Sequence, residues 1–253
     1  TGGLQLGENL MLAGEPGVDK SLLVMGMAAH LGKSAPGTIY SMEMQDTQIG
    51  RRLISGHAKI QTSALKKGKI LESDYPRFLE AIEYLAALPI TISDATGWTT
   101  TSMRADLARQ KSQNGVEWYV VDYLHLLDDA LHLSDTERTG RISRGLKGTS
   151  QSLNLAGIII NSMTKEGMNS AGIAPSQTGM RGSGQVLHDA DLITFLTKYP
   201  DNNLPGDMVS AKDRENLRVL WFAKGRELES DRKWITLVKQ PGFPSFGEYR
   251  GML

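Results

Sequence analysis

The segment that most constrains the fold of this chain occupies residues 10–23, near the start of the sequence. Its first residues are apolar, as in a buried strand, and they lead through a Gly/Pro turn into a run with helical spacing. In a phosphate-binding loop with this layout, backbone N–H groups and a helix N-terminus surround the phosphates. A lysine reaches the terminal phosphates, and the hydroxyl that follows it ligates Mg²⁺. The residues expected to line this loop are Gly14, Glu15, Pro16, Gly17, Val18, Asp19, Lys20, Ser21 and Leu22.

Asp19 departs from the pattern G-x-x-x-x-G-K-[ST], which has glycine directly before the lysine. Glycine permits a backbone conformation that most residues resist, and it lets phosphates approach closely. An aspartate adds bulk and places a negative charge beside a polyanion. We therefore expect Asp19→Gly to tighten nucleotide binding. For this segment alone, a surface turn with a chance Lys-Ser pair is the alternative interpretation.

Two other apolar runs end in carboxylates and support the nucleotide interpretation. Glu117-Trp-Tyr-Val-Val-Asp122 has the form of a strand whose final aspartate helps to hold Mg²⁺. Thr38-Ile-Tyr-Ser-Met-Glu43 places Glu43 beyond the end of another strand, where α/β sheets bind their ligands. There a carboxylate could polarise the water that attacks the γ-phosphate. The alternatives are a buried strand that ends at an aspartate turn and a solvated acid at a strand end.

Six short segments, spread almost from end to end of the chain, carry a resemblance to a known family. They are Thr1-Gly-Gly-Leu-Gln5, Ser41-Met-Glu-Met44, Val121-Asp-Tyr-Leu-His-Leu126, Arg141-Ile-Ser-Arg-Gly-Leu-Lys147, Met180-Arg-Gly-Ser-Gly184 with His188-Asp-Ala-Asp191, and Phe222-Ala-Lys-Gly-Arg226. In this order they resemble the RecA-like motor domain of hexameric replicative helicases of the DnaB type.

The resemblance implies an α/β fold of the RecA-like P-loop NTPase class. A mostly parallel central sheet would be flanked by helices and extended by antiparallel C-terminal strands. It also implies an ATP-hydrolysing DNA helicase that uses ATP and Mg²⁺, translocates on single-stranded DNA as a hexameric ring and unwinds duplex at a replication fork. A homohexamer of the full-length protein, a primase and a helicase loader are the implied protein partners.

The resemblance also implies roles for individual residues. Lys20 would neutralise the β- and γ-phosphates, and Ser21 together with Asp122 would hold Mg²⁺. Glu43 would orient or deprotonate the attacking water. Arg226, with Lys224, would reach from one subunit into its neighbour's site as an arginine finger.

A DNA-facing loop is expected within residues 164–184, which are rich in Gly, Ser, Met and Thr. Lys165 and Arg181 would supply positive charge, while Gly182 and Gly184 would let backbone N–H groups approach phosphates closely. The loop contains no aromatic residue, so we expect contacts with the DNA backbone that are indifferent to sequence.

Two further positions depart from the family pattern. Ser162 stands in the sensor segment where the family usually has glutamine, and His125 also replaces a usual glutamine. These changes, together with Asp19, leave a second hypothesis open. The chain could be a degenerate RecA-like module that binds nucleotide or DNA with little hydrolysis. Retention of Glu43, Asp122, Lys224 and Arg226 favours the motor.

Composition fits a single α/β domain over residues 1–253. The chain is 40% hydrophobic, its 28 basic residues balance 28 acidic ones, and it has no cysteine, which excludes disulfides and Cys-based metal sites. No apolar run approaches the ~20 residues of a membrane span, so we expect a cytoplasmic protein with no membrane partner. The chain begins without methionine inside the first motif, and we expect an excised motor domain that lacks an N-terminal collar.

Hydrophobic periodicity predicts alternating strands and helices. The expected helices are 20–31, 46–58, 73–88, 99–112 and 135–155. The expected strands are 10–13, 38–42, 90–93, 117–122, 157–161, 192–198, 217–223 and 233–239. Gly140, Gly145 and Gly148 weaken the helical expectation for residues 135–155. Strands separated by helices imply parallel βαβ units with right-handed crossovers.

Overall fold

The fold is described from a computed structural model. It covers residues 3–163, 175, 177–180, 182–200, 204, 209–210, 213–225, 234–240 and 242–249. Within these ranges, no helix has both the length and the apolar character needed to cross a membrane.

One mixed sheet forms the centre of the molecule, with strand order β3-β2-β4-β5-β1-β6-β7-β8-β9. Pairing is parallel from β3 through β6 and antiparallel from β6 to β9. The strands are β1 Asn9–Gly14, β2 Gly37–Ser41, β3 Ile90–Asp94, β4 Trp118–Asp122, β5 Ala156–Ile160, β6 Leu192–Lys198, β7 Leu217–Lys224, β8 Trp234–Lys239 and β9 Phe246–Glu248. This arrangement confirms the expected fold class, including the antiparallel extension.

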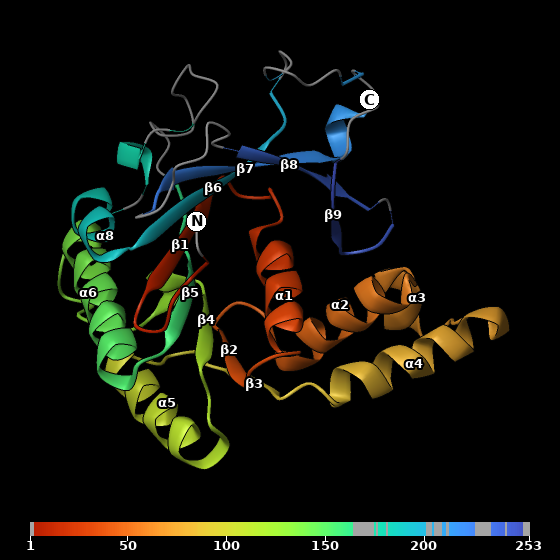
Figure 1. The fold of residues 1–253 in the computed structure, drawn as a ribbon, viewed down its shortest axis with the longest axis horizontal. Helices are drawn as coiled ribbons and strands as arrows, with labels where there is room; N and C mark the ends of the chain where they lie inside the picture. Colours follow the sequence, from red (N-terminus) through yellow and green to blue (C-terminus); the bar gives the residue numbers. More distant parts are fainter. Residues whose placement is uncertain are drawn as a thin grey trace.

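Helices cover both faces of the parallel part of the sheet. In Figure 1, α5, α6 and α8 lie on one face, and α1 lies on the other face beside α2, α3 and α4. The helices are α1 Lys20–Leu31, α2 Asp46–Ala58, α3 Thr62–Lys67, α4 Tyr75–Ala86, α5 Thr100–Asn114, α6 Asp135–Leu153 and α8 Ser183–Asp189. Because both faces are covered, β1, β2 and β4 are buried along their whole length, as their nearly continuous apolar runs predict.

Local signals account for several helix boundaries. Ser134 caps α6 and Thr99 caps α5, each through a capping box with the residue three positions later. Helix α6 ends at Leu153, where Asn154 takes a left-handed conformation. The boundaries of α1, α2 and β6 agree with those expected from periodicity.

The glycines of α6 allow close packing with neighbouring helices. A Cβ atom on Gly140 would lie 3.0 Å from the Gln185 side chain of α8, and one on Gly145 would lie 3.1 Å from Thr100 of α5. The expectation that these glycines weaken the helix considered only intrinsic propensity. Packing against α5 and α8 stabilises α6 instead, and the helix is continuous through all three glycines.

Three short elements were not expected from the sequence: α3, α8 and β9. Helix α3 has six residues and buries none of them, so it lacks an apolar period. Helix α8 begins inside a glycine-rich stretch that resembles a loop. Strand β9 has three residues and pairs with β8 at the end of the sheet. Each depends on tertiary contacts more than on local pattern.

Candidate nucleotide-binding site

The candidate site lies where the parallel strands end. Ser41, the last residue of β2, pairs with Asp122, the last residue of β4. The backbone N–H of Met42 donates to the Asp122 carbonyl oxygen at 2.9 Å. The turn after β1 leads directly into α1 at the same edge. The topology therefore brings three separate segments, each with a sequence-predicted site residue, to the carboxyl edge of the sheet, where α/β proteins bind ligands.

The turn between β1 and α1 requires glycine at its first position. A Cβ atom on Gly14 would lie 2.3 Å from the carbonyl oxygen of Leu196 in β6, closer than any side chain can approach. Gly17 has φ +77°, in the left-handed region that glycine favours. Val18 is fully buried and anchors the turn to the apolar cluster around α1. These constraints fix the backbone course that the sequence pattern predicts.

Asp19 adopts the conformation for which the family pattern reserves glycine. It has φ 69° and ψ 35°, in the left-handed region, and it is the N-cap residue of α1. Its carboxylate accepts hydrogen bonds from Arg218 Nη2 at 3.1 Å and from Lys239 Nζ at 3.0 Å. The expected negative charge beside the loop is therefore present, and two cations are paired with it. Nothing in the local sequence singles out Arg218 or Lys239 for this role.

Lys20 folds back over the turn. Its Nζ donates to the carbonyl oxygens of Gly14 and Glu15, each at 2.8 Å. Burial lowers the pKa of the Lys20 ammonium, while the nearby carboxylates, led by Asp122 and Glu43, oppose that shift. The ammonium therefore lies at the mouth of the turn, held by neutral carbonyl partners that an anionic ligand could replace.

Asp122 provides a buried carboxylate beside Ser21. The residue is only 2% exposed, and burial raises the pKa of Asp122, while a hydrogen bond from the Ser21 hydroxyl opposes the shift. One carboxylate oxygen, Oδ1, has no hydrogen-bond partner within the described part of the chain. A buried, incompletely paired carboxylate oxygen next to a hydroxyl is a suitable ligand set for a hard cation such as Mg²⁺. The residues present fit the metal that accompanies a nucleotide.

Glu43 lies two residues beyond the end of β2 and is exposed. It is close enough to Lys20 and Asp122 to affect the protonation of both. The turn that carries it is held by a hydrogen bond from Met44 N to Ser41 Oγ at 3.1 Å. Glu43 therefore places a solvent-accessible carboxylate at the same edge of the sheet as Lys20 and Asp122.

Ser162 follows β5, the strand between β1 and β4. Its backbone N–H donates to Asn161 Oδ1 at 2.8 Å, and its buried hydroxyl has no hydrogen-bond partner among the described residues. The next residue, Met163, forms a β-bridge with Met180. Ser162, the expected sensor residue, is thus directly followed by a residue that pairs with the segment preceding α8.

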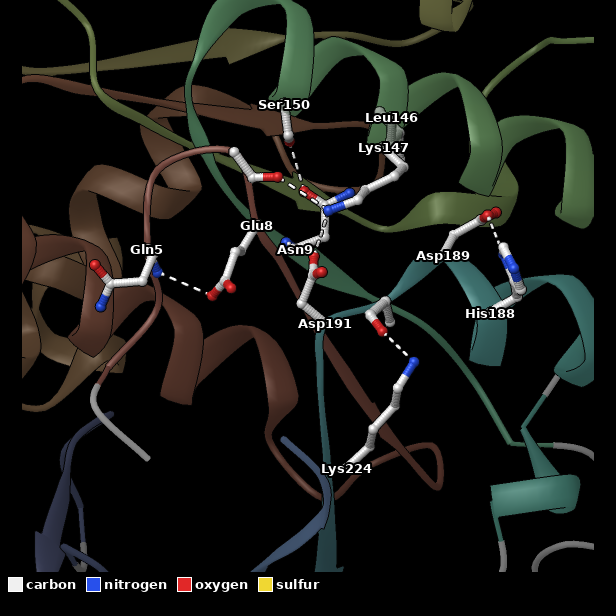
Figure 2. Close-up of polar contacts among 12 residues, drawn as sticks. Gln5, Glu8, Asn9, Leu146, Lys147, Ser150, His188, Asp189, Asp191 and Lys224 are labelled. Carbon is white, nitrogen blue, oxygen red and sulfur yellow. Dashed lines mark hydrogen bonds and ion pairs between the residues drawn. The ribbon is translucent and has the colours of Figure 1, made fainter. Parts of the chain in front are cut away.

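Lys224 lies at the opposite edge of the sheet. Antiparallel pairing places Arg218 beside Lys198 at the end of β6 and Lys224 beside Ile193 near its start. Lys224 Nζ donates to the carbonyl oxygens of Leu187 and Ala190, each at 2.6 Å. Figure 2 shows one of these two hydrogen bonds as a dashed line from Lys224. Lys224 therefore does not join Lys20 and Asp122 within one chain. Arg226, the other expected finger residue, lies outside the described residues.

A buried ion pair holds α6 to the beginning of β6 near Lys224. Lys147 Nζ donates to Asp191 Oδ2 at 2.6 Å and to the Gly7 carbonyl oxygen at 3.0 Å. The same Asp191 oxygen accepts from the backbone N–H of Asn9 at 2.8 Å (Figure 2). The cluster joins β1, β6 and α6 at the edge opposite the phosphate site, so its role is structural.

Two of the four expected DNA-binding residues are described. Gly182 is the N-cap residue of α8, with φ +67°, and a Cβ atom there would lie 2.4 Å from Thr139 Cγ2 of α6. Gly184 is exposed, and a Cβ atom there would meet nothing within 4 Å. Lys165 and Arg181 lie outside the described residues.

Sequence comparison relates the chain to replicative helicases. A family model described as the DnaB-like helicase C-terminal domain matches residues 1–235. The replicative DNA helicase DnaB of Treponema pallidum is 29% identical over 217 residues, covering 85% of this chain and 49% of that protein. DnaB of Synechocystis is also 29% identical, over 84% of this chain and 24% of that protein. The replicative DNA helicase DnaC of Bacillus subtilis is 26% identical, over 85% and 49%. The chain thus spans at most about half the length of these relatives.

Solved structures agree at the level of the fold. A solved ATPase domain superposes with a TM-score of 0.85 at 23% identity, covering 97% of this chain and 86% of that one. A DnaB-like replicative helicase, described with its interactions with primase, gives the same TM-score and identity over 98% of this chain and 59% of that one. With the family match over 1–235, the resemblance seen in the sequence is confirmed. The chain belongs to the DnaB-like helicase C-terminal domain family.

Proposed function

We propose that residues 1–253 form a single motor domain that binds and hydrolyses ATP to drive a DNA helicase. The observation that carries this proposal is the meeting of Lys20, Ser21, Asp122 and Glu43 at one edge of the sheet, although they come from three separate segments. Their side chains supply a phosphate-binding cation, a metal-ligating pair and a water-activating carboxylate. Family membership supports the same function, because the matched relatives are replicative DNA helicases.

In this proposal the triphosphate lies along the turn between β1 and α1. Lys20 exchanges the carbonyl oxygens of Gly14 and Glu15 for phosphate oxygens and neutralises their charge. Ser21 and Asp122 would hold Mg²⁺, which would supply charge neutralisation at the phosphates. The exposed Glu43 orients the attacking water and accepts its proton.

The finger residues act between subunits. Lys224 lies at the edge opposite the chain's own phosphate site, which supports a finger that approaches the triphosphate of a neighbouring subunit. Arg226 is assigned to the same finger by the family resemblance. We therefore propose that the motor works as a homohexameric ring.

The DNA-facing loop, with Lys165, Arg181, Gly182 and Gly184, contacts the backbone of single-stranded DNA in this proposal. Ser162 senses the γ-phosphate. A primase and a helicase loader are its proposed partners, in the cytoplasm.

A degenerate module with little hydrolysis is the second candidate, and Asp19 is the observation that favours it. A carboxylate next to the phosphates weakens their binding if it is unpaired. In this chain it is paired with Arg218 and Lys239, and Glu43 and Asp122 are retained at the site. The arrangement supports the motor more strongly than the degenerate module.

ATP hydrolysis with and without single-stranded DNA tests the proposal. The wild-type chain, Asp19→Gly and Glu43→Gln are compared over a range of protein concentrations that includes assembled rings. We expect DNA-stimulated hydrolysis by the wild type that Glu43→Gln removes while leaving nucleotide binding intact. If wild type and Asp19→Gly hydrolyse ATP no faster than Glu43→Gln in assembled rings, the motor function is refuted and the degenerate module is supported.

A further inference from the structure

Three charged side chains meet behind the phosphate-binding turn. Asp19 Oδ2 lies 3.1 Å from Arg218 Nη2, and both Asp19 oxygens lie 3.0 Å from Lys239 Nζ. The Arg218 side chain is 8% exposed, that of Asp19 23% and that of Lys239 34%. The group is therefore largely enclosed, and solvent screens it less than it screens a surface ion pair.

The sheet brings the two cations to the turn from the C-terminal strands. Arg218 is the second residue of β7, and Lys239 is the last residue of β8. Antiparallel pairing places both at the edge where β1 ends. By strand alternation, Arg218 shares a face with Leu220, and Lys239 shares a face with Leu237, and both leucines pack in the cluster around α1. The two basic side chains thus lie on the α1 face, at the start of that helix.

Backbone carbonyl groups orient the guanidinium of Arg218 independently of its contact with Asp19. Its Nη1 donates to the carbonyl oxygens of Glu215 and Leu217, at 2.9 and 2.8 Å, which leaves Nη2 directed at the Asp19 carboxylate. Lys239 then contacts both oxygens of that carboxylate. The aspartate is drawn toward β7 and β8, and the group of three carries a net positive charge.

We propose that Arg218 and Lys239 are positioning residues of the phosphate-binding turn. They hold Asp19 in its left-handed conformation and neutralise its carboxylate, so that an aspartate can occupy a position that the family pattern gives to glycine. This inference rests on the proposed nucleotide-binding function. The pairing lets the turn keep its backbone course despite Asp19. The two cations are therefore needed for nucleotide binding only in a chain that has aspartate at position 19.

A mutant cycle on nucleotide affinity tests this dependence. Calorimetry with Mg²⁺ and a non-hydrolysable ATP analogue compares wild type, Lys239→Met, Asp19→Gly and the double variant. Lys239→Met is expected to weaken affinity about three- to tenfold in the wild type, because it leaves part of the carboxylate charge unpaired beside the phosphates. In the Asp19→Gly background the same change should have less than a twofold effect. Lys239→Arg keeps a cation at this position and should bind the analogue with wild-type affinity.

Lys198→Met is the matched control, because it removes an exposed lysine at the same edge of the sheet that forms no ion pair with Asp19 within the described residues. It should change affinity less than twofold. An equal or larger effect of Lys239→Met in the Asp19→Gly background overturns the proposal, because Lys239 would then act on the phosphates directly.

Urea unfolding of the same four proteins gives a readout that needs no nucleotide. If Lys239 acts on the turn through Asp19, the changes in unfolding free energy caused by Lys239→Met and Asp19→Gly should not add in the double variant. Strict additivity overturns the proposal whatever the affinities are. Absence of analogue binding in wild type and Asp19→Gly, combined with non-additive unfolding, instead refutes the nucleotide function and leaves the pairing of the turn intact.

Discussion

Gly182 and Gly184 lie two residues apart in one segment, yet the structure predicts opposite effects for the same substitution at the two positions. Gly182 has φ +67°, and an added Cβ would lie 2.4 Å from Thr139 Cγ2 on the buried side of α6. At Gly184 an added Cβ meets nothing within 4 Å, and the residue lies in the first turn of α8. Gly182→Ala should destabilise the fold, and Gly184→Ala should not.

Two physical effects set the magnitude at Gly182. A left-handed conformation costs an alanine roughly 1–2 kcal/mol relative to glycine. Overpacking against a buried side chain typically costs a further ~1–3 kcal/mol. The expected loss is therefore about 2–5 kcal/mol in the free energy of unfolding. Gly184→Ala should leave stability unchanged or raise it by up to about 1 kcal/mol, because alanine has the higher helix propensity.

Urea denaturation followed by circular dichroism measures both changes, and Thr139→Ser divides the larger one into its causes. Removing the Thr139 methyl group relieves only part of the overpacking, because Thr139 Cβ would still lie 2.8 Å from the added atom, and it leaves the backbone conformation as it is. Gly182→Ala should therefore recover only part of its loss in the Thr139→Ser background. Equal stabilities for Gly182→Ala and Gly184→Ala would refute the argument from packing and backbone conformation. Full recovery by Thr139→Ser would refute the backbone contribution alone.

Three further predictions concern the site. Burial raises the pKa of Asp122, so its ionised form opposes folding at neutral pH. Asp122→Asn should therefore stabilise the nucleotide-free protein at pH 7, measured as a higher urea midpoint. The difference in midpoint should shrink as the pH falls, because wild-type Asp122 then takes up a proton. Arg226→Ala should leave nucleotide binding by one subunit intact and abolish assembly-dependent hydrolysis, and mixing it with Glu43→Gln subunits should partly restore turnover; unrestored activity in mixed rings would argue for a role within one chain. Arg181→Ala should weaken binding of assembled rings to every single-stranded DNA sequence alike and flatten the salt dependence by about one unit of slope per lost phosphate contact, whereas an altered sequence preference would show that this arginine contacts bases.

The parallel half of the fold was predictable because local pattern and topology agree there. Apolar runs bounded by Gly, Pro and charged residues fix α1, α2 and β6 to the residue. Parallel strands gather their carboxyl ends at one edge, so the sequence predicts that Lys20, Glu43 and Asp122 lie at one site.

The pairing of Asp19 could not be predicted in the same way. Its partners lie 199 and 220 residues further along the chain, on strands that return antiparallel to the phosphate edge. No local pattern marks Arg218 or Lys239, since an arginine near the start of a strand and a lysine at the end of one are common on sheet edges. The contacts of Lys224 with the end of α8 were hidden for the same reason. Such contacts depend on strand order, which periodicity does not determine.

Strand β7 begins behind the phosphate-binding turn of its own chain and ends at the far edge of the sheet. Arg218 at its start holds Asp19, and Lys224, six residues later, lies about 20 Å away at the usual rise of an extended strand. In the proposed ring, this strand would connect the nucleotide pocket of each subunit to Lys224, across an irregularity in the β6–β7 register between Phe222 and Lys224. A displacement of Asp19 would reach the start of β7 through its pairing with Arg218, and from there Lys224 through covalent backbone.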